Sequence, residues 1–379
     1  MALQKKSSAT GRLIAASSEE SADILYASGF YGPDEFFWFD CGGGRKGVLV
    51  SSLEYSRALK EVRRGVAVLT ASSLGISPAG GALLPVALAE KYGIRKWIVP
   101  PRFPLACADA LRKAGIEVEC SDGEFFPERR IKKKSECAAI GKAMKATEEA
   151  MMLVHDILKR STVNSSGQLV FSGKILTCDF LRAEVEAEFK RKAFSASRTI
   201  IACGRDSARP HCIGSGPVLA GQPVVADIFP RSDITGYWGD MTRTFLKGKA
   251  PTVVRKAFDA VKAASETALG MIRAGVRASD VHLAAAEVMA RAGFPTGRDP
   301  EGNPCGFFHS LGHGVGLEIH ELPRVSPAND GLLQSGNVIS VEPGLYYAAW
   351  GGVRLEDLVL VTQDSCRNFC SMPKELEIP

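Results

Sequence analysis

The sequence lacks the features that mark several large classes of protein. Its 379 residues contain no apolar segment long enough to cross a bilayer, and the stretch MALQKKSSATGRLIAASSEES has no continuous apolar run of the kind that targeting peptides carry. Its ten cysteines include no CxxC pair, so neither a structural zinc site nor a disulfide framework is indicated. We therefore expect a cytoplasmic protein with no membrane partner.

The chain also lacks a large excess of charge of either sign. The formal net charge of +5 is too small to indicate a nucleic-acid-binding protein. The densest basic run, residues 129–134, follows Pro127 and has no interleaved aromatic residue, so we interpret it as a solvated linker with no nucleic-acid partner. The stretch DCGGGRKG lacks the GK[ST] ending of a phosphate loop and predicts a turn at Gly42–Gly44.

Helix-like and strand-like patterns alternate ahead of this linker. ADILYASGF is typical of a helix and GVLVSS of a strand; AVLTAS, a helix over 84–92, KWIVP and a helix ending at Gly115 follow. This alternation indicates an α/β domain, which we assign to residues 1–130. A second domain, residues 136–379, opens with a long helix over 135–158, and further helices are predicted over 253–273 and 280–291.

Five residues in the last two-fifths of the chain have the chemistry of a two-metal site. They are Asp227, Asp240, His313, Glu342 and Glu356. Carboxylates bridge two cations and offset their charge, while a neutral imidazole caps one of them, so this set suits two divalent ions. The carboxylates interrupt apolar strand runs, a costly position without a cation. Manganese, cobalt and zinc all fit.

Two strand-turn-strand segments and one glycine-rich segment carry these residues. VVADIFPRSDITGYWGDMTRTF predicts two strands with Asp227 facing Asp240, and Asp233 is assigned to the turn because turn aspartates make local hydrogen bonds. VISVEPGLYYAAWGGVRLEDLVLVT predicts two more strands, with Glu342 ending one apolar run and Glu356 inside the other. Glycines 312, 314 and 316 allow close backbone approach around His313, where a bulky side chain would crowd a metal.

These segments resemble the peptidase family of methionine aminopeptidase, aminopeptidase P and prolidase. The resemblance covers roughly residues 137–379 and rests on GYWGDMTRTF, GHGVGLEIHE, and VEPGLYY followed by VRLED. It implies a mixed α/β (α+β) fold, with a ribonuclease-H-like, creatinase-type N-terminal domain and a pita-bread catalytic domain. The two aspartates are two residues further apart than is usual in the family, but an insertion of two residues in the turn preserves strand parity and keeps Asp227 facing the site.

The resemblance also implies roles for residues around the metals. Two metal ions would bridge a water and hold it as hydroxide, Glu342 would serve as general base and acid, and His320 would stabilise the tetrahedral intermediate. It implies an outer position for His211 and His309, in recognition of proline or a carboxylate. Two histidines in helix-like stretches, His155 and His282, fall outside this cluster.

Several alternatives stay open. The three site histidines resemble the branch that cleaves the bond before proline, so we expect peptide substrates with proline in second position and manganese as the native ion. Arg324 and Arg354 are available cations; Arg324 on a dipeptide carboxylate would indicate prolidase, while a surface pairing leaves aminopeptidase P open.

Two other functions compete with the peptidase. They are a creatinase-like hydrolase of a non-peptide bond and a non-catalytic binding scaffold, and both predict lost metal ligands. The family often forms homodimers, and the aromatic segment Phe36–Phe39 is a candidate contact or equally a core strand.

Overall fold

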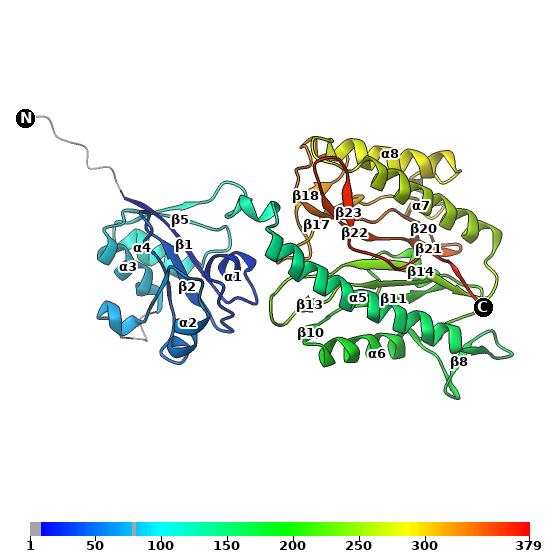
Figure 1. Ribbon diagram of the computed structural model, residues 1–379, viewed down its shortest axis with the longest axis horizontal. Coiled ribbons are helices and arrows are strands. Elements are labelled where there is room, and N and C mark those ends of the chain that lie inside the picture. The colour runs from blue at the N-terminus through cyan, green and yellow to red at the C-terminus, as the bar shows by residue number, and fades with distance from the viewer. Residues whose placement is uncertain (1–8, 78–80) are drawn as a thin grey trace, which may run out of the picture. The chain divides into compact units, whose positions relative to one another are not determined.

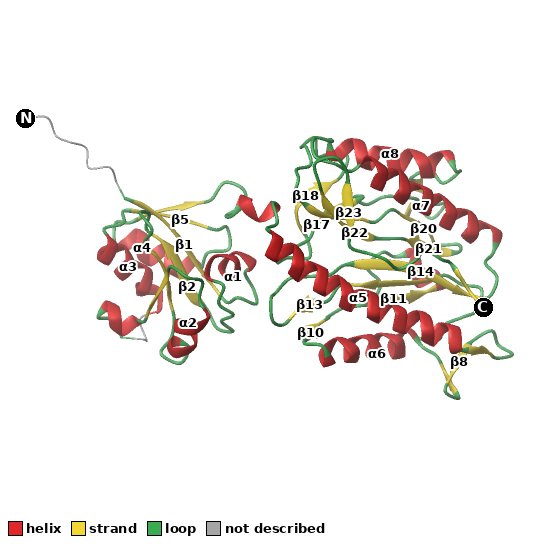
Figure 2. Ribbon diagram, viewed as in Figure 1, coloured by secondary structure: helices red, strands yellow, loops and turns green. Residues whose placement is uncertain are grey.

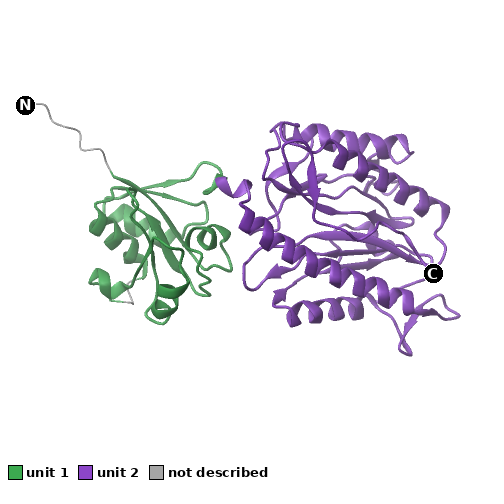
Figure 3. Cartoon of the chain, viewed as in Figure 1, with its two compact units in different colours: residues 1–127 green, residues 128–379 purple. Residues whose placement is uncertain are grey.

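The computed structural model describes residues 9–77 and 81–379 and divides the chain into two compact units, residues 1–127 and 128–379 (Figure 3). The division follows Pro127, directly ahead of the basic run. None of the helices in the described ranges is both long enough and apolar enough to cross a membrane.

Unit 1 is built on a six-stranded mixed sheet in the order β4-β3-β2-β1-β5-β6. Its strands are β1 (Thr10–Ala16), β2 (Phe36–Asp40), β3 (Lys46–Leu49), β4 (Val66–Leu69), β5 (Lys96–Val99) and β6 (Glu117–Cys120). Its helices are α1 (Ala22–Ser28), α2 (Tyr55–Glu61), α3 (Leu84–Tyr92) and α4 (Leu105–Lys113), with the short 3-10 helices η1 (Ala71–Leu74) and η2 (Gly81–Leu83) (Figure 2). The alternation of helix and strand read from the sequence is confirmed.

The aromatic strand β2 lies in the core of unit 1. Its residues Phe36, Phe37, Trp38 and Phe39 are buried because β2 is an interior strand between β1 and β3 and both of its faces are covered. The interpretation of this segment as a core strand is confirmed, and these buried side chains leave no surface for a contact between subunits. The predicted turn is confirmed too, since Gly42–Gly44 join β2 to β3 with positive φ.

Unit 2 has helices on both sides of its sheets, with α5 (Lys134–Arg160) and α6 (Cys178–Arg191) on one side and α7 (Thr252–Met271) and α8 (Ala278–Arg291) on the other (Figure 1). The 3-10 helix η3 (Pro127–Arg130) precedes α5, and η4 (Gly204–Ala208) follows β11. In α5, buried residues recur every three or four positions, as at Ile140, Met144 and Met151, so one stripe of the helix faces the core. All three helices predicted for this half are present, with ends shifted by no more than two residues.

Two sheets form the framework of unit 2. One has the order β11-β12-β14-β24 and the other β18-β17-β19-β22-β23. Their strands are β11 (Ile200–Cys203), β12 (Val224–Ile228), β14 (Met241–Lys247), β24 (Glu377–Ile378), β17 (Gly312–Gly314), β18 (Glu321–Val325), β19 (Val338–Val341), β22 (Asp357–Val361) and β23 (Cys366–Asn368). Shorter strands are β7 (Thr162–Val163), β8 (Leu169–Phe171), β9 (Lys174–Ile175), β10 (Phe194–Ser195), β13 (Arg231–Ser232), β15 (Gly297–Arg298), β16 (Pro304–Cys305), β20 (Gly344–Tyr347) and β21 (Gly351–Arg354). A backbone hydrogen bond from Glu356 to Thr242 (3.0 Å) links the two sheets.

The basic run at the start of unit 2 differs from its predicted solvated state. Arg129 and Lys132 bond the carboxylate of Glu321, at 2.8 and 2.5 Å, and their side chains are only 11% and 2% exposed. The acidic partner lies 189 residues from Lys132 in the sequence. The sequence of the basic run alone therefore could not show that Arg129 and Lys132 form ion pairs with a distant glutamate.

Candidate metal centre

A cavity of about 750 Å³ in unit 2 is lined by all ten residues that the sequence singled out. They are Asp227, Asp240, His313, Glu342, Glu356, His211, His309, His320, Arg324 and Arg354. Apolar side chains, among them Ile200, Phe229, Phe308 and Ile319, line the same cavity. Its size and its mixture of apolar wall and a few polar groups are typical of a site for a small molecule.

The two aspartates come from neighbouring antiparallel strands. Asp227 belongs to β12, where it pairs with Thr242 of β14, and Asp240 directly precedes β14. The longer turn between these strands leaves Asp227 in the cavity, as strand parity requires. Asp233 lies in the turn region outside the cavity, where it accepts hydrogen bonds from Ser195 (2.6 Å) and Lys190 (3.2 Å).

The segment that carries the two glutamates forms four strands, whereas two were predicted. Glu342 follows the end of β19 and Glu356 precedes β22, and these strands pair through Val341 and Asp357. The residues between them form a separate hairpin, β20 with β21. Pro343 gives the reason, because a proline has no N–H to continue a β-ladder. Glu356 therefore lies between two strands, and the prediction that it lies inside one is wrong.

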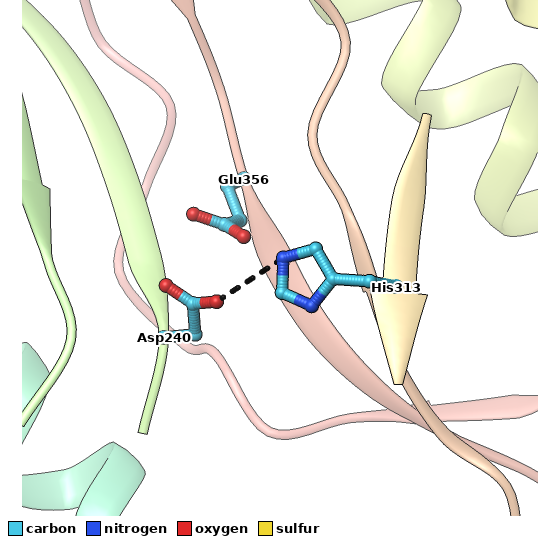
Figure 4. A group of neighbouring side chains, drawn as sticks. All are labelled: Asp240, His313 and Glu356. Carbon is cyan, nitrogen blue, oxygen red and sulfur yellow. Dashed lines mark ion pairs between the residues drawn. The ribbon is translucent and has the colours of Figure 1, made fainter. Parts of the chain in front are cut away.

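Three of the expected ligands converge closely (Figure 4). Ligand atoms of Asp240, His313 and Glu356 all lie within 4.8 Å of one another, and His313 Nε2 is 3.7 Å from Asp240 Oδ2 and 3.2 Å from Glu342 Oε1. The other ring nitrogen, Nδ1, bonds the Gly314 carbonyl at 3.1 Å. Because a carbonyl can only accept, Nδ1 carries a proton, and Nε2 faces the carboxylates, where after loss of its own proton it would offer a lone pair to a metal.

The electrostatics of this cluster fit bound cations. Burial, and then the charges of neighbouring carboxylates, raise the pKa values of Asp240 and Glu356 well above their usual range. Burial also acts on Glu342, but the hydrogen bond and charge of His313 lower its pKa to about 2. Divalent cations would remove the repulsion among these buried carboxylates. The donor set therefore fits divalent cations.

Arg354 is buried beside Asp227 and is not a free cation. Its guanidinium donates to Asp227 Oδ2 (2.6 Å), to the Tyr346 hydroxyl (2.8 Å) and to Thr242 Oγ1 (3.1 Å). The Thr242 hydroxyl in turn donates to Glu356 Oε2 at 2.8 Å. Arg354 therefore orients two carboxylates of the site, and its expected use in binding a substrate would require it to release these partners.

A second buried arginine, Arg243, supports the site from the C-terminal part of the chain. It donates to the Glu356 carbonyl (2.6 Å), to Asp357 Oδ1 (2.9 Å) and to the Met372 carbonyl (2.9 Å). Sequence reasoning missed both this arginine and Tyr346. The only signal was the placement of each beside a ligand-bearing motif, Arg243 in MTRTF and Tyr346 in VEPGLYY.

The histidines differ in their availability. His309 uses both ring nitrogens, Nδ1 toward the Ser310 carbonyl (2.8 Å) and Nε2 toward the Tyr346 hydroxyl (3.0 Å), so a substrate would have to replace Tyr346. His320 is exposed to the cavity and packs edge-on against His313, with ring centroids 4.4 Å apart; burial and the charge of His313 lower its pKa to about 4. His211 is an exposed residue of the cavity wall.

His282, which the sequence left outside the cluster, lies close to it. Its Nδ1 accepts a hydrogen bond from the Leu311 N–H (3.2 Å), and its ring stacks on Phe307, which contacts His309 edge-on. Burial, and then the charge of His309, lower its pKa to about 4. His282 is thus a neutral side chain behind the cavity wall.

The glycines around His313 serve the packing of strands. A Cβ at Gly312 would lie 1.9 Å from the Ser340 carbonyl oxygen, and one at Gly314 would lie 2.4 Å from the Leu322 carbonyl oxygen. Close backbone approach was predicted correctly, and at these two glycines the group approached is the backbone of a neighbouring strand.

Arg324 is an exposed residue of the cavity wall. Within the part of the chain that the structure describes, its side chain forms no ion pair, and its backbone carbonyl accepts a hydrogen bond from Asn329 Nδ2 at 2.5 Å. Its positive charge contributes to lowering the pKa of His320. A cation thus faces the side of the cavity where His320 lies.

Comparison with known proteins identifies relatives that match most of the chain. The sequence profile described as metallopeptidase family M24 matches residues 138–363. The chain is 32% identical over 249 residues to the Xaa-Pro dipeptidase of Pyrococcus furiosus and 31% identical over 287 residues to that of Pyrococcus horikoshii. These alignments cover 65% and 75% of this chain and the same shares of the relatives, so the first spans just under two thirds of its relative.

Solved structures agree over nearly the full length. The prolidase from Pyrococcus horikoshii has a TM-score of 0.80 at 27% identity and covers 97% of this chain and 95% of its own. The X-Pro aminopeptidase from Thermotoga maritima has a TM-score of 0.81 at 23% identity, covers 97% of both chains, and shows a shared fold. The predicted mixed α/β fold class, with an N-terminal domain ahead of the catalytic one, is confirmed.

Proposed function

Because the chain belongs to metallopeptidase family M24, we propose that it hydrolyses the peptide bond between an N-terminal residue and proline. The observation that carries the proposal is the gathering of all ten expected residues around one cavity. Relatives named Xaa-Pro dipeptidase support the choice of substrate. A creatinase-like hydrolase or a binding scaffold would be expected to have lost metal ligands, and all five are present.

The proposed metal ligands are Asp227, Asp240, His313, Glu342 and Glu356. Two divalent cations bound there would supply Lewis acidity and lower the pKa of a water molecule. We propose manganese as the native ion, with cobalt and zinc as alternatives that the same oxygen and nitrogen donors accept.

Glu342 is the proposed proton carrier. Near neutral pH its carboxylate, which lies in the ligand cluster 3.2 Å from His313 Nε2, is placed to take a proton from the attacking water and deliver it to the leaving nitrogen. His320 is neutral at that pH and exposed to the cavity, so a ring N–H is free to donate to the oxygen that becomes negative during attack. His211 and His309 take outer positions in substrate recognition, His309 after exchange of its bond to Tyr346.

We propose that dipeptides are the preferred substrates. A dipeptide ends in a carboxylate close to the bond that is cut, and Arg324 offers a planar guanidinium that matches a carboxylate with two hydrogen bonds. Its exposure to the cavity and its lack of an ion pair among the described residues support this role. An aminopeptidase P would have no need for this cation.

Release of the N-terminal residue from Xaa-Pro dipeptides and from longer Xaa-Pro-Xaa peptides tests these proposals. The protein is loaded with manganese and compared with Asp240→Ala, which removes one proposed ligand. Cleavage of dipeptides alone supports a dipeptidase, and cleavage of the longer peptides supports an aminopeptidase P. Metal-independent cleavage, or no cleavage of either class, would refute the proline peptidase.

We also propose that the protein is cytoplasmic and forms a homodimer. All ten cysteines are free thiols, as is usual in a reducing cytoplasm. For a homodimer, Leu53, Tyr55 and Leu59 of unit 1 offer apolar surface, with Leu53 85% exposed. Sedimentation of the native protein and of a Leu53→Ser, Leu59→Ser variant tests this: a dimer that persists in the variant would exclude this surface.

A further inference from the structure

We propose that Arg129 and Lys132, from the basic run at the start of unit 2, are positioning residues for His320. The inference rests on the proposed function, in which His320 acts on the substrate. Neither residue lines the cavity, so each acts through the ion pair with Glu321, the residue that follows His320.

His320 ends a loop, residues 315–320, that joins β17 to β18. Trp238 holds one part of this loop: its backbone N–H donates to the Gly316 carbonyl (3.0 Å) and its ring N–H to the Leu317 carbonyl (3.1 Å). These bonds are made near the beginning of the loop. The end that carries His320 depends on other contacts.

Glu321 supplies those contacts. Its Oε1 accepts a hydrogen bond from Lys132 Nζ (2.5 Å), and its Oε2 accepts one from Arg129 Nη2 (2.8 Å). Arg129 Nη2 also donates to Glu318 of the loop (2.8 Å). The carboxylate lies against the loop backbone, since a Cβ at Gly316 would be 2.5 Å from Oε1. Arg129 and Lys132 therefore hold the loop at Glu318 and at Glu321, on both sides of His320.

The cations are themselves held in place. The Lys132 N–H donates to the Gly336 carbonyl (2.8 Å), and the Arg130 carbonyl accepts from Asn337 Nδ2 (3.0 Å). Both acceptor and donor lie directly before β19, the strand that leads to Glu342. The ion pair thus fixes the loop of His320 relative to the strand of the proposed proton carrier.

The Lys132–Glu321 ion pair is buried, so each charge depends on its partner. The Lys132 side chain is 2% exposed and that of Glu321 is 6% exposed. If Lys132 is removed, the buried Glu321 carboxylate keeps only Arg129 as a cation, and if Glu321 is removed, the buried Lys132 ammonium loses its carboxylate. A buried charge that loses a partner is strongly unfavourable, so in the first case the carboxylate is driven toward water. Since Glu321 is covalently joined to His320, that movement displaces the imidazole. A displacement of about 1 Å can cost about a hundredfold in rate.

The test compares Lys132→Met and Glu321→Gln with Lys134→Met, which changes an exposed lysine of the same run. The double variant Lys132→Met with Glu321→Gln removes both charges of the Lys132–Glu321 pair and leaves Arg129 paired with Glu318, so it retains the fold if a single change does not. We expect kcat on an Xaa-Pro dipeptide to fall by about ten- to a hundredfold in the first two and in the double variant, with KM changed by less than about threefold. Lys134→Met should match the wild type.

A second cycle separates positioning from general stability. In a His320→Ala background, Lys132→Met should cause almost no further loss of kcat, because the residue through which it acts is already absent. The proposal would be overturned if Lys132→Met lowered kcat by the same factor in the wild-type and His320→Ala backgrounds. It would also be overturned if the variant with both Lys132→Met and Glu321→Gln had the kcat of the wild type.

Hydrogen exchange of the loop amides keeps the two proposals distinguishable. We expect faster exchange over residues 315–320 in Lys132→Met than in Lys134→Met, at equal metal content. If wild-type protein does not cleave Xaa-Pro peptides but this difference is found, the proposed function fails and the positioning of the loop stands. If exchange is unchanged in an active enzyme, the positioning proposal fails alone.

Discussion

Replacement of Arg354 by methionine should reveal how strongly the site depends on its buried cation. The substitution keeps an unbranched stem but deletes the donors to Asp227, Tyr346 and Thr242. Without metal, the substitution leaves Asp227 as a buried carboxylate that has lost its ion pair with Arg354. This loss costs about 3–5 kcal/mol of folding free energy. With metal bound, the cations offset that charge, and the loss reduces to two neutral acceptors at about 1 kcal/mol each, or about 2 kcal/mol.

Urea unfolding of wild type and Arg354→Met, in chelator and at saturating metal, measures both values. Arg291→Met is the control, because its guanidinium makes a helix-surface pair with Glu287 that contributes only about 0.3–0.5 kcal/mol. A destabilisation below about 1 kcal/mol in chelator would refute the argument that Asp227 needs this partner. An equal loss with and without metal would refute the argument that cations replace it.

Three further predictions concern substrate, packing and pH. Arg324→Met should lower kcat/KM for an Xaa-Pro dipeptide by about ten- to a hundredfold, as loss of a charge-assisted bond predicts, and leave an Xaa-Pro amide unchanged; equal losses on both would exclude a carboxylate contact. Gly312→Ala should cost about 3 kcal/mol or more in urea unfolding, because its Cβ would overlap the Ser340 carbonyl, whereas Gly270→Ala, with no neighbour there, should be neutral or stabilising. Burial opposes ionisation of Asp357, but Arg243 and Lys374 hold its pKa below the usual value. Its stabilising effect is therefore present above the unfolded pKa of about 3.9 and lost as pH falls through the folded value, so Asp357→Asn should flatten the acid limb of unfolding free energy against pH.

The proposed metal ligands were accessible from the sequence because their chemistry is unusual where it stands. A carboxylate beside an apolar strand run is costly unless a cation accompanies it, so Asp227 and Asp240 drew notice without any knowledge of the fold. Strand period then placed them on one face, and the register of Asp227 with Thr242 agrees with that argument. Local rules carried this part of the site.

The partners of those carboxylates were beyond local rules. Arg354 was visible as a cation, but nothing near it in the sequence shows that it bonds a carboxylate 127 residues away. Lys132 was predicted to be solvated, because a run of lysines and arginines usually faces solvent. In the structure it bonds Glu321, which lies 189 residues away in the sequence. Glu356 was placed inside a strand because the break at Pro343, and the hairpin that it starts, were not included in the pattern. Long-range pairing, more than secondary structure, limited the prediction.

The anchoring of Arg243 to the Met372 carbonyl also bears on the order in which the protein can acquire its metals during synthesis. Glu356 and the segment around Met372 are made after Asp227, Asp240 and His313, and β14 cannot pair with β24 until residues 377–378 have been made. A shorter nascent chain would expose Asp227, Asp240 and His313 without the groups that complete and brace the site. Because contacts this distant in sequence form slowly, metal uptake is expected to follow synthesis of residues 356–378 and to be selective only once these contacts have formed.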